Sequence, residues 1–290
     1  MNVSKILKAG AAVAGAAAAV YAGIFAGKKI EWFNNYKKLV PYEVRTVKGT
    51  SLEGRDDYVL IAHRGFRAVA PENTLPAYEE AGKAGYWGAE CDIYMTRDGV
   101  WVLHHDPITS RMMDGNKSLE LATYNELLKL NYTNGHNVGK YPNLKICTLE
   151  DFFKKCAEYG MKATVELKYN RNRDHYDKII ELQNKYGVEA TYIAFSFEDL
   201  QKFREICDAP LFLLVDDITD EAIEKAKTLE NCGISYDCNN VYNTDNDGEM
   251  IKRVHAAGLK TATWTCDRID LMEKLVSYGT RFITSNCITY

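Results

Sequence analysis

Short apolar or β-branched runs alternate with amphipathic segments along the chain after residue 55. Such runs, bounded by turn residues, predict buried strands, and apolar positions at helical spacing predict helices. The predicted strands are 58–63, 87–93, 161–167, 191–196, 211–215, 233–237, 260–265 and 281–284. The predicted helices are 74–85, 148–159, 175–187, 198–207, 219–230, 247–257 and 270–278. The order is therefore strand then helix almost throughout.

One segment interrupts this order. The run VWVLHH at residues 100–105 follows a turn at 97–99, so it is expected to pair with the second strand as a hairpin. Residues 107–147 then form an insertion before the next regular helix. Eight strands with interleaved helices, and no GxGxxG after the first strand, favour a closed barrel over a doubly wound sheet. We predict an α/β fold, a (β/α)8 TIM barrel over residues 56–290.

The N-terminal region has a different pattern. Residues 9–27 carry no charge and as a helix would span roughly 28 Å, just enough for a bilayer. Most of them are Ala and Gly, which insert weakly. We predict that residues 1–30 form an N-terminal hydrophobic helix, either a membrane anchor or a signal segment, with a linker at 31–55. Membrane association through 9–27 is expected; secretion after cleavage and a cytoplasmic location, with an Ala-rich helix packed on the domain, are the alternatives.

Composition adds limits on partners. The 290 residues are 46% hydrophobic and 26% charged, which is enough for a large core. The net charge of −4 provides no field that gathers nucleic acid, so no nucleic-acid partner is expected. The eight cysteines form no CxxC pair and are expected to be free thiols in the core. Nothing in the sequence indicates the oligomeric state.

Acidic residues occur on two predicted strands where apolar residues are expected. Strand alternation places Glu90 and Asp92 on one face, and likewise Glu166 and Lys168, all toward the barrel mouth where chemistry gathers. Neighbouring carboxylates repel by roughly 4 kcal/mol per pair at an effective dielectric constant of about 20. One divalent cation, Mg²⁺ or Ca²⁺, would offset this repulsion, since hard cations prefer oxygen ligands. The alternative is ion pairing with Arg64 or Lys168 and no metal.

Five short signatures follow one another along the chain. They are His63-Arg64-Gly65, Pro71-Glu72-Asn73-Thr74, Glu90-x-Asp92 with Thr96-x-Asp98-Gly99, His105-Asp106, and Glu166-x-Lys168. In order and spacing they resemble the glycerophosphodiester phosphodiesterase family over roughly residues 58–290. The resemblance implies metal-dependent hydrolysis of glycerophosphodiesters to sn-glycerol 3-phosphate and an alcohol, on a barrel with a small insertion. A lysophospholipase D or sphingomyelinase D-like activity on membrane lipids is the alternative, and a barrel that only binds phosphodiesters is a third.

The resemblance also implies residue roles. It makes Glu90, Asp92 and Glu166 the metal ligands, His63 and His105 the general acid and base, and Arg64 and Lys168 the phosphate contacts. Trp264, on the seventh predicted strand, is expected to line the substrate pocket as an aromatic platform. His104 points away from His105 by strand alternation, so a packing role is expected for it.

Two stretches depart from the family pattern. The last strand usually ends in Thr-Asp with a Pro shortly after, but residues 284–287 read TSNC, and Cys147 stands where a Pro often precedes Thr-Leu. Neither position is catalytic in the family scheme. Both stretches are expected at the rim of the pocket, where they would affect which diesters fit. The sequence does not predict the alcohol group of the substrate. Asn73 and Thr74 are expected to cap the first helix.

Overall fold

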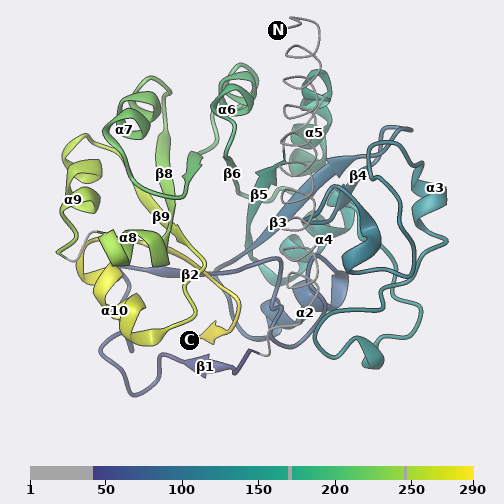
Figure 1. Ribbon diagram of the computed structural model, residues 1–290, viewed down its shortest axis with the longest axis horizontal. Coiled ribbons are helices and arrows are strands. Elements are labelled where there is room, and N and C mark those ends of the chain that lie inside the picture. Colours follow the sequence, from purple (N-terminus) through teal and green to yellow (C-terminus); the bar gives the residue numbers. More distant parts are fainter. Residues whose placement is uncertain (1–41, 169–171, 245–246) are drawn as a thin grey trace, which may run out of the picture. The chain divides into compact units, whose positions relative to one another are not determined.

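The computed structural model describes residues 42–168, 172–244 and 247–290. Its centre is a ring of eight parallel strands, with neighbours in the order β2-β10-β9-β8-β7-β6-β5-β3 and closure through β2 and β3 (Figure 1). The strands are β2 (Val59–Ala62), β3 (Gly88–Met95), β5 (Lys162–Leu167), β6 (Ala190–Ala194), β7 (Leu211–Val215), β8 (Cys232–Asp237), β9 (Thr261–Trp264) and β10 (Phe282–Ser285). The predicted TIM barrel is confirmed, and each predicted strand is present within a few residues of its expected ends.

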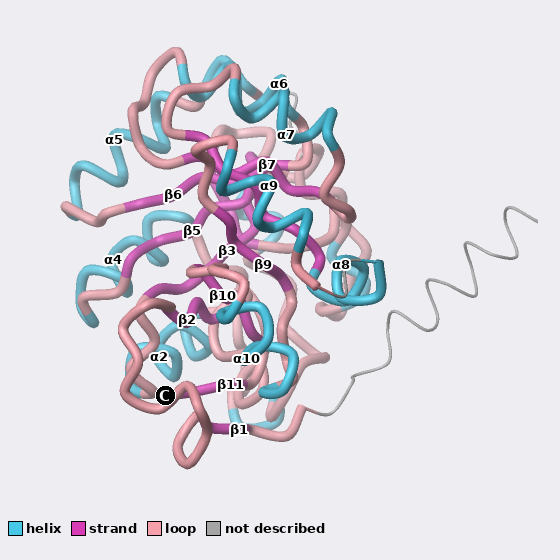
Figure 2. The backbone as a smooth tube through the Cα atoms, turned by 90° about the vertical axis from the view of Figure 1, so that its left-hand side faces the viewer, coloured by secondary structure: helices cyan, strands magenta, loops and turns pink. Residues whose placement is uncertain are grey.

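Helices surround the ring of strands (Figure 2). They are α2 (Leu75–Lys83), α4 (Leu149–Tyr159), α5 (Asp177–Tyr186), α6 (Phe197–Arg204), α7 (Asp220–Lys227), α9 (Glu249–Ala256) and α10 (Ile269–Ser277). The start of α4 is determined by residues close together in the sequence. Thr148 and Asp151 exchange side-chain to backbone hydrogen bonds in a capping box. A further helix, α8 (Cys238–Thr244), follows β8 directly and was not predicted.

The main core lies between the ring and the helices. Outward-pointing strand residues such as Cys91, Val165 and Leu167 are fully or almost fully buried there, which leaves the alternate positions to face the barrel interior. All eight cysteines are free thiols, and seven of them are buried, as expected. The same alternation that builds the core therefore directs the acidic residues of β3 and β5 inward.

The predicted hairpin and insertion are both present. Strand β4 (Trp101–Leu103) pairs antiparallel with the end of β3. The insertion contains the short helix α3 (Tyr124–Leu127) and two single 3₁₀ turns, Thr109–Arg111 and Val138–Lys140. Its apolar side chains form a separate cluster with the hairpin. This small core holds the Thr109–Arg111 turn beside the barrel mouth.

Two short strands join the two ends of the described chain. Strand β1 (Arg45–Thr46) pairs in parallel with β11 (Ile288–Thr289). The nearby Val47 and Leu52 are buried in the main core. Residues 42–55, which lie in the predicted linker 31–55, are thus folded against the barrel. No pattern in the sequence indicated this pairing, because two-residue strands have no detectable period.

The predicted hydrophobic segment at residues 9–27 lies outside the described residues. Within residues 42–168, 172–244 and 247–290, no helix has the length and apolar character needed to cross a membrane. The N-terminal helix and membrane attachment therefore stay predictions from sequence.

Candidate active site

Three carboxylates meet at the C-terminal mouth of the barrel. Asp92 on β3 lies directly opposite Glu166 on β5, and Glu90 is one inward position earlier on β3. One carboxylate oxygen from each residue lies within 4.8 Å of the other two. All three residues are buried. The structure therefore brings together the three acids singled out from the sequence.

Nearby cations balance these acids unequally. Lys168 Nζ lies 2.9 Å from Asp92 Oδ1 and 2.8 Å from Glu166 Oε1, and Arg64 Nε lies 3.3 Å from Asp92 Oδ2. Glu90 Oε2 accepts the backbone N–H of Arg64 at 2.8 Å. Its other oxygen, Oε1, is buried without a hydrogen-bond partner among the described residues. The ion pairs of the metal-free alternative are thus present for Asp92 and Glu166, but at Glu90 the charge of Arg64 does not outweigh burial and the neighbouring acids.

The charges of the acids respond to this environment. Burial, together with the charges of Asp92 and Glu166, raises the pKa of Glu90 well above its usual value. Burial also raises the pKa of Glu166 to about 7, although Lys168 opposes the shift. Burial acts in the same direction on Asp92, but Lys168 and Arg64 outweigh it and hold the pKa of Asp92 well below its usual value. Without a further cation, the three groups are not all anionic at neutral pH.

The turn after β2 explains the His-Arg-Gly motif. Arg64 and Gly65 both have left-handed backbone conformations, with φ of 57° and 79°. This turn directs the Arg64 N–H to Glu90. A Cβ at residue 65 would lie 2.7 Å from the backbone carbon of Ala77 in α2, so only glycine fits.

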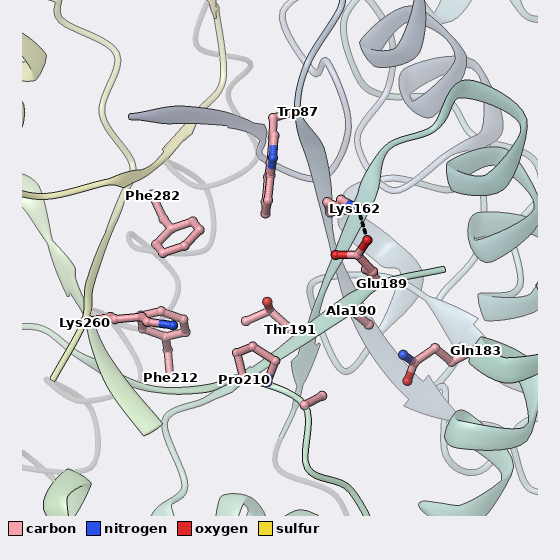
Figure 3. A pocket seen from close by; sticks show the side chains of 11 residues that line it. Trp87, Lys162, Gln183, Glu189, Ala190, Thr191, Pro210, Phe212, Lys260 and Phe282 are labelled. Atoms are coloured by element: carbon pink, nitrogen blue, oxygen red, sulfur yellow. Dashed lines mark hydrogen bonds and ion pairs between the residues drawn. The ribbon is translucent and has the colours of Figure 1, made fainter. Parts of the chain in front are cut away.

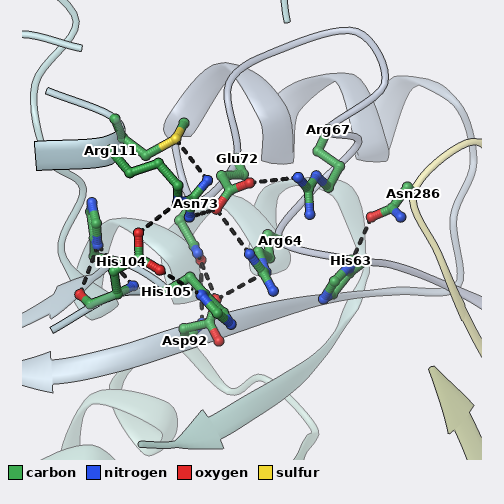
Figure 4. Close-up of polar contacts among 12 residues, drawn as sticks. His63, Arg64, Arg67, Glu72, Asn73, Asp92, His104, His105, Arg111 and Asn286 are labelled. Atoms are coloured by element: carbon green, nitrogen blue, oxygen red, sulfur yellow. Dashed lines mark hydrogen bonds and ion pairs between the residues drawn. The ribbon is translucent and has the colours of Figure 1, made fainter. Parts of the chain in front are cut away.

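Glu72 holds three arginines at the site. Its Oε1 accepts from Arg64 Nη1 at 2.9 Å and from Arg111 Nη2 at 2.5 Å, and its Oε2 lies 2.8 Å from Arg67 Nη2 (Figure 4). Burial would raise the pKa of Glu72, but the three guanidinium groups hold it well below its usual value. Arg111 comes from the insertion and also donates from Nε to Asp106 Oδ2 at 2.6 Å. Glu72 belongs to the Pro71-Glu72-Asn73-Thr74 signature, but no role was predicted for it. No pattern in the sequence indicated a role for Arg111.

Asn73 has a role other than the predicted cap. Its Nδ2 donates to Asp92 Oδ2 at 2.7 Å, and its Oδ1 accepts from the Asp92 N–H at 3.2 Å and from the Tyr78 hydroxyl at 3.0 Å. Thr74 occupies the N-cap position of α2 but makes no side-chain cap bond. The capping prediction was wrong for the side chains, because a buried carboxylate competes more strongly for the amide than the helix end does.

Each candidate catalytic histidine has a partner at Nδ1. His105 Nδ1 lies 2.9 Å from Asp106 Oδ1, and His63 Nδ1 lies 2.7 Å from Asn286 Oδ1 (Figure 4). Burial first, and the charge of Arg64 second, lowers the pKa of His105 to about 4 and that of His63 well below its usual value. Both imidazoles are therefore neutral at pH 7. Asn286 belongs to a stretch that departs from the family pattern, so that departure touches the site itself.

Seven of the eight candidate residues line one cavity of about 180 Å³: His63, Arg64, Glu90, His105, Glu166, Lys168 and Trp264. Asp92 lies behind them with no exposed surface. Trp264 forms one wall of this cavity. The ring of Phe195 packs edge-on against it, with 5.5 Å between the two ring centroids. Phe195 is 52% exposed, so the wall reaches the surface. His104 is buried and does not line this cavity, as strand alternation predicts.

A larger cavity lies at the opposite end of the barrel. It measures about 370 Å³ and is lined by residues at or near the N-terminal ends of strands, including Trp87, Phe212 and Phe282 (Figure 3). Its acidic residue, Glu189, is paired with Lys162. Its volume exceeds that of the cavity at the C-terminal mouth, but the converging acids and histidines are all at that other mouth. Charge and geometry therefore identify the smaller cavity as the candidate site.

Several known proteins are similar to this chain in sequence. A sequence model of the glycerophosphoryl diester phosphodiesterase family matches residues 63–288. Human glycerophosphodiester phosphodiesterase 1 is 38% identical over 139 residues, which cover 48% of this chain and 40% of that protein. A glycerophosphodiester phosphodiesterase of Caldanaerobacter subterraneus is 26% identical over 227 residues, which cover 76% of this chain and 90% of that protein.

A solved structure is also similar. It is an Oleispira antarctica phosphodiesterase in complex with the product sn-glycerol-3-phosphate, with a TM-score of 0.71, 25% identity, and coverage of 79% of this chain and 92% of that one. The mammalian relatives are matched over only 36–40% of their own length. The family match itself extends from His63 almost to the C-terminus. The chain belongs to the glycerophosphoryl diester phosphodiesterase family.

Proposed function

We propose that this chain catalyses metal-dependent hydrolysis of glycerophosphodiesters to sn-glycerol 3-phosphate and an alcohol. The observation that carries the proposal is the meeting of Glu90, Asp92 and Glu166 beside a cavity that two neutral histidines line. Family membership supports the reaction class. The product named for the Oleispira antarctica relative, sn-glycerol-3-phosphate, supports the substrate class.

The three acids fit one divalent cation, Mg²⁺ or Ca²⁺. Within the part of the chain that the structure describes, the buried Glu90 Oε1 has no hydrogen-bond partner, which is the environment expected of a metal-ligating oxygen. An all-oxygen donor set selects a hard cation. Asn73 orients Asp92 and the Arg64 N–H orients Glu90, as outer-shell groups do around metal ligands. When bound, such a cation neutralises phosphate charge and increases the acidity of a coordinated hydroxyl.

The other candidate residues would bind the phosphate and transfer protons. The planar guanidinium of Arg64, held by Glu72, suits two parallel hydrogen bonds to a phosphate, and Lys168 supplies a compact positive charge. Phosphodiester cleavage deprotonates a hydroxyl nucleophile and protonates the leaving alcohol. Neutral His63 and His105 are assigned to these two proton transfers. Trp264 is assigned to the wall that receives the substrate.

A substrate panel with metal titration tests the proposal. Purified protein is incubated with glycerophosphocholine, glycerophosphoethanolamine or lysophosphatidylcholine, and release of sn-glycerol 3-phosphate or of choline is measured. EDTA should abolish hydrolysis of the soluble diesters, and Mg²⁺ or Ca²⁺ should restore it. Full activity in EDTA would exclude the metal. Cleavage of lysophosphatidylcholine alone would replace the proposal with the lysophospholipase D alternative.

Histidine variants test the assigned roles. H63A and H105A should each lose at least about a hundredfold in kcat, the usual contribution of a general acid or base, while circular dichroism shows an unchanged fold. H175A is the matched control, since His175 is exposed and does not line the cavity. A wild-type rate in H63A or H105A would remove that residue from the mechanism.

Membrane attachment through residues 9–27 is a separate proposal. It rests on the charge-free sequence of that segment alone. Cell fractionation of the tagged full-length chain tests it. Recovery of the full-length protein in the soluble fraction would contradict attachment and would leave the proposed hydrolysis untouched.

A further inference from the structure

Two further polar side chains, Asn286 and Asp267, extend the hydrogen bonding from His63 away from the cavity. Asn286 lies directly after β10 and is only 4% exposed; its Oδ1 is 2.7 Å from His63 Nδ1. Asn286 is in turn held by Asp267: its Nδ2 donates to Asp267 Oδ2 at 2.6 Å, and its backbone N–H donates to Asp267 Oδ1 at 2.8 Å. Asp267 Oδ1 also accepts from the Ser285 hydroxyl at 3.1 Å.

The carboxylate of Asp267 sets the donor and acceptor in each hydrogen bond from Asp267 through Asn286 to His63. The oxygen and nitrogen of an asparagine amide have nearly the same shape, so its orientation follows from its partners. An ionised carboxylate only accepts hydrogen bonds. The Asn286 atom that faces Asp267 must therefore be the NH₂ group, and the atom that faces His63 must be the carbonyl oxygen. Since that oxygen only accepts, His63 Nδ1 must carry a hydrogen.

This direction suits proton transfer in both senses. A neutral imidazole with its hydrogen on Nδ1 has an unprotonated Nε2, which can accept a proton. The doubly protonated ring keeps the same Nδ1–H bond to Asn286 and can return the proton from Nε2. An NH₂ group facing Nδ1 would favour the opposite tautomer and repel the protonated ring. The Thr265 hydroxyl, 3.4 Å from His63 Nδ1, can donate or accept and so sets no direction.

We propose that Asp267 and Asn286 are positioning residues that hold the hydrogen of His63 on Nδ1 and leave Nε2 for proton transfer. Neither residue is assigned a contact with the substrate. The inference rests on the proposed function in one respect, that His63 transfers a proton during hydrolysis. The position of the hydrogen on the ring can be measured independently of turnover.

The variant D267N tests the direction of the chain with almost no change in shape. The oxygen that accepts from the Asn286 N–H and the Ser285 hydroxyl must stay an oxygen, so the new NH₂ group takes the place that faces the Asn286 side chain. The Asn286 amide then turns its oxygen toward that NH₂ group and its own NH₂ toward His63. We expect kcat for glycerophosphocholine to fall at least about a hundredfold with KM within about threefold of wild type. Nitrogen-15 NMR of labelled histidine should show the ring hydrogen of His63 moving from Nδ1 to Nε2.

The double variant D267N/N286D is the rescue. The carboxylate introduced by N286D accepts from the NH₂ group introduced by D267N and, with its other oxygen, from His63 Nδ1–H. We expect it to regain at least about tenfold in kcat over D267N and to return the hydrogen to Nδ1. D270N is the matched control, since Asp270 is an exposed carboxylate paired with Arg268, and it should behave as wild type.

Three results would overturn the inference. They are a wild-type kcat in D267N, a wild-type ring already protonated at Nε2, and a double variant no more active than D267N, since the last would mean that D267N acts by disturbing the fold. Failure of the proposed function gives a different result. If the wild-type protein cleaves no glycerophosphodiester, the proposed function fails, and the NMR signal of His63 in wild type and D267N alone decides the inference.

Discussion

The buried ion pairs of Glu72 allow a quantitative prediction for the variant E72Q. The Glu72 side chain is 4% exposed and is shared by Arg64, Arg67 and Arg111, whose side chains are 11%, 18% and 7% exposed. Removing one partner of a buried ion pair costs about 3–5 kcal/mol, because the remaining charge stays buried without compensation. At about 2–4 °C per kcal/mol for a domain of this size, Tm should fall by about 6–20 °C. Thermal unfolding followed by circular dichroism measures this fall.

The pH dependence of stability gives a second measurement on the same variant. The arginines hold the folded-state pKa of Glu72 well below its usual value. The carboxylate therefore stabilises the fold fully above its unfolded-state pKa of about 4.3, and this contribution is lost as the pH falls through the folded-state pKa. The difference in unfolding free energy between wild type and E72Q should be largest at neutral pH and should narrow below about pH 4.3. Urea unfolding at several pH values measures it.

The matched control is E79Q on the surface of α2. Glu79 pairs with Lys83 at 2.7 Å, but the side chains are 40% and 52% exposed. Such a pair contributes no more than about 1 kcal/mol, so the Tm of E79Q should fall by no more than about 4 °C. If E72Q and E79Q lose the same amount, the three arginines are compensated by other groups and the reasoning about Glu72 is refuted.

Two further predictions concern the metal and the turn after β2. The Mg²⁺ affinity of the metal-free protein, measured by titration calorimetry, should be at least about tenfold weaker at pH 6 than at pH 8, because Glu166 has a pKa of about 7 and must lose its proton to bind a cation, and the raised pKa of Glu90 acts in the same direction; equal affinities would count against Glu166 as a ligand. G65A should be destabilised by about 1–3 kcal/mol more than G54A in urea unfolding. Both glycines have left-handed backbones, but only the added Cβ at residue 65 meets the backbone of Ala77, at 2.7 Å, so equal losses would contradict the close contact.

Local patterns in the sequence were sufficient for the barrel and for most of the site. Strand alternation alone directed Glu90 and Asp92 into the barrel and Cys91 toward the helices, and the structure agrees. The hairpin after β3 and the capping box of α4 are also local features, readable from residues within a few positions of each other. Closure of the ring through β2 and β3 leaves none of the eight parallel strands at a sheet edge.

Contacts between distant segments were decided only by the tertiary structure. Asn286 reaches His63 across 223 positions, and Arg111 reaches Glu72 from an insertion without a regular pattern. Asn73 was expected to cap the first helix, but its amide bonds Asp92 instead. Periodicity encodes which face of an element is buried, whereas the partner of a buried polar group depends on which segments the closed barrel places side by side. For this protein, the sequence by itself determined which residues enter the barrel mouth, and only the folded chain decided which neighbours orient them and balance their charge.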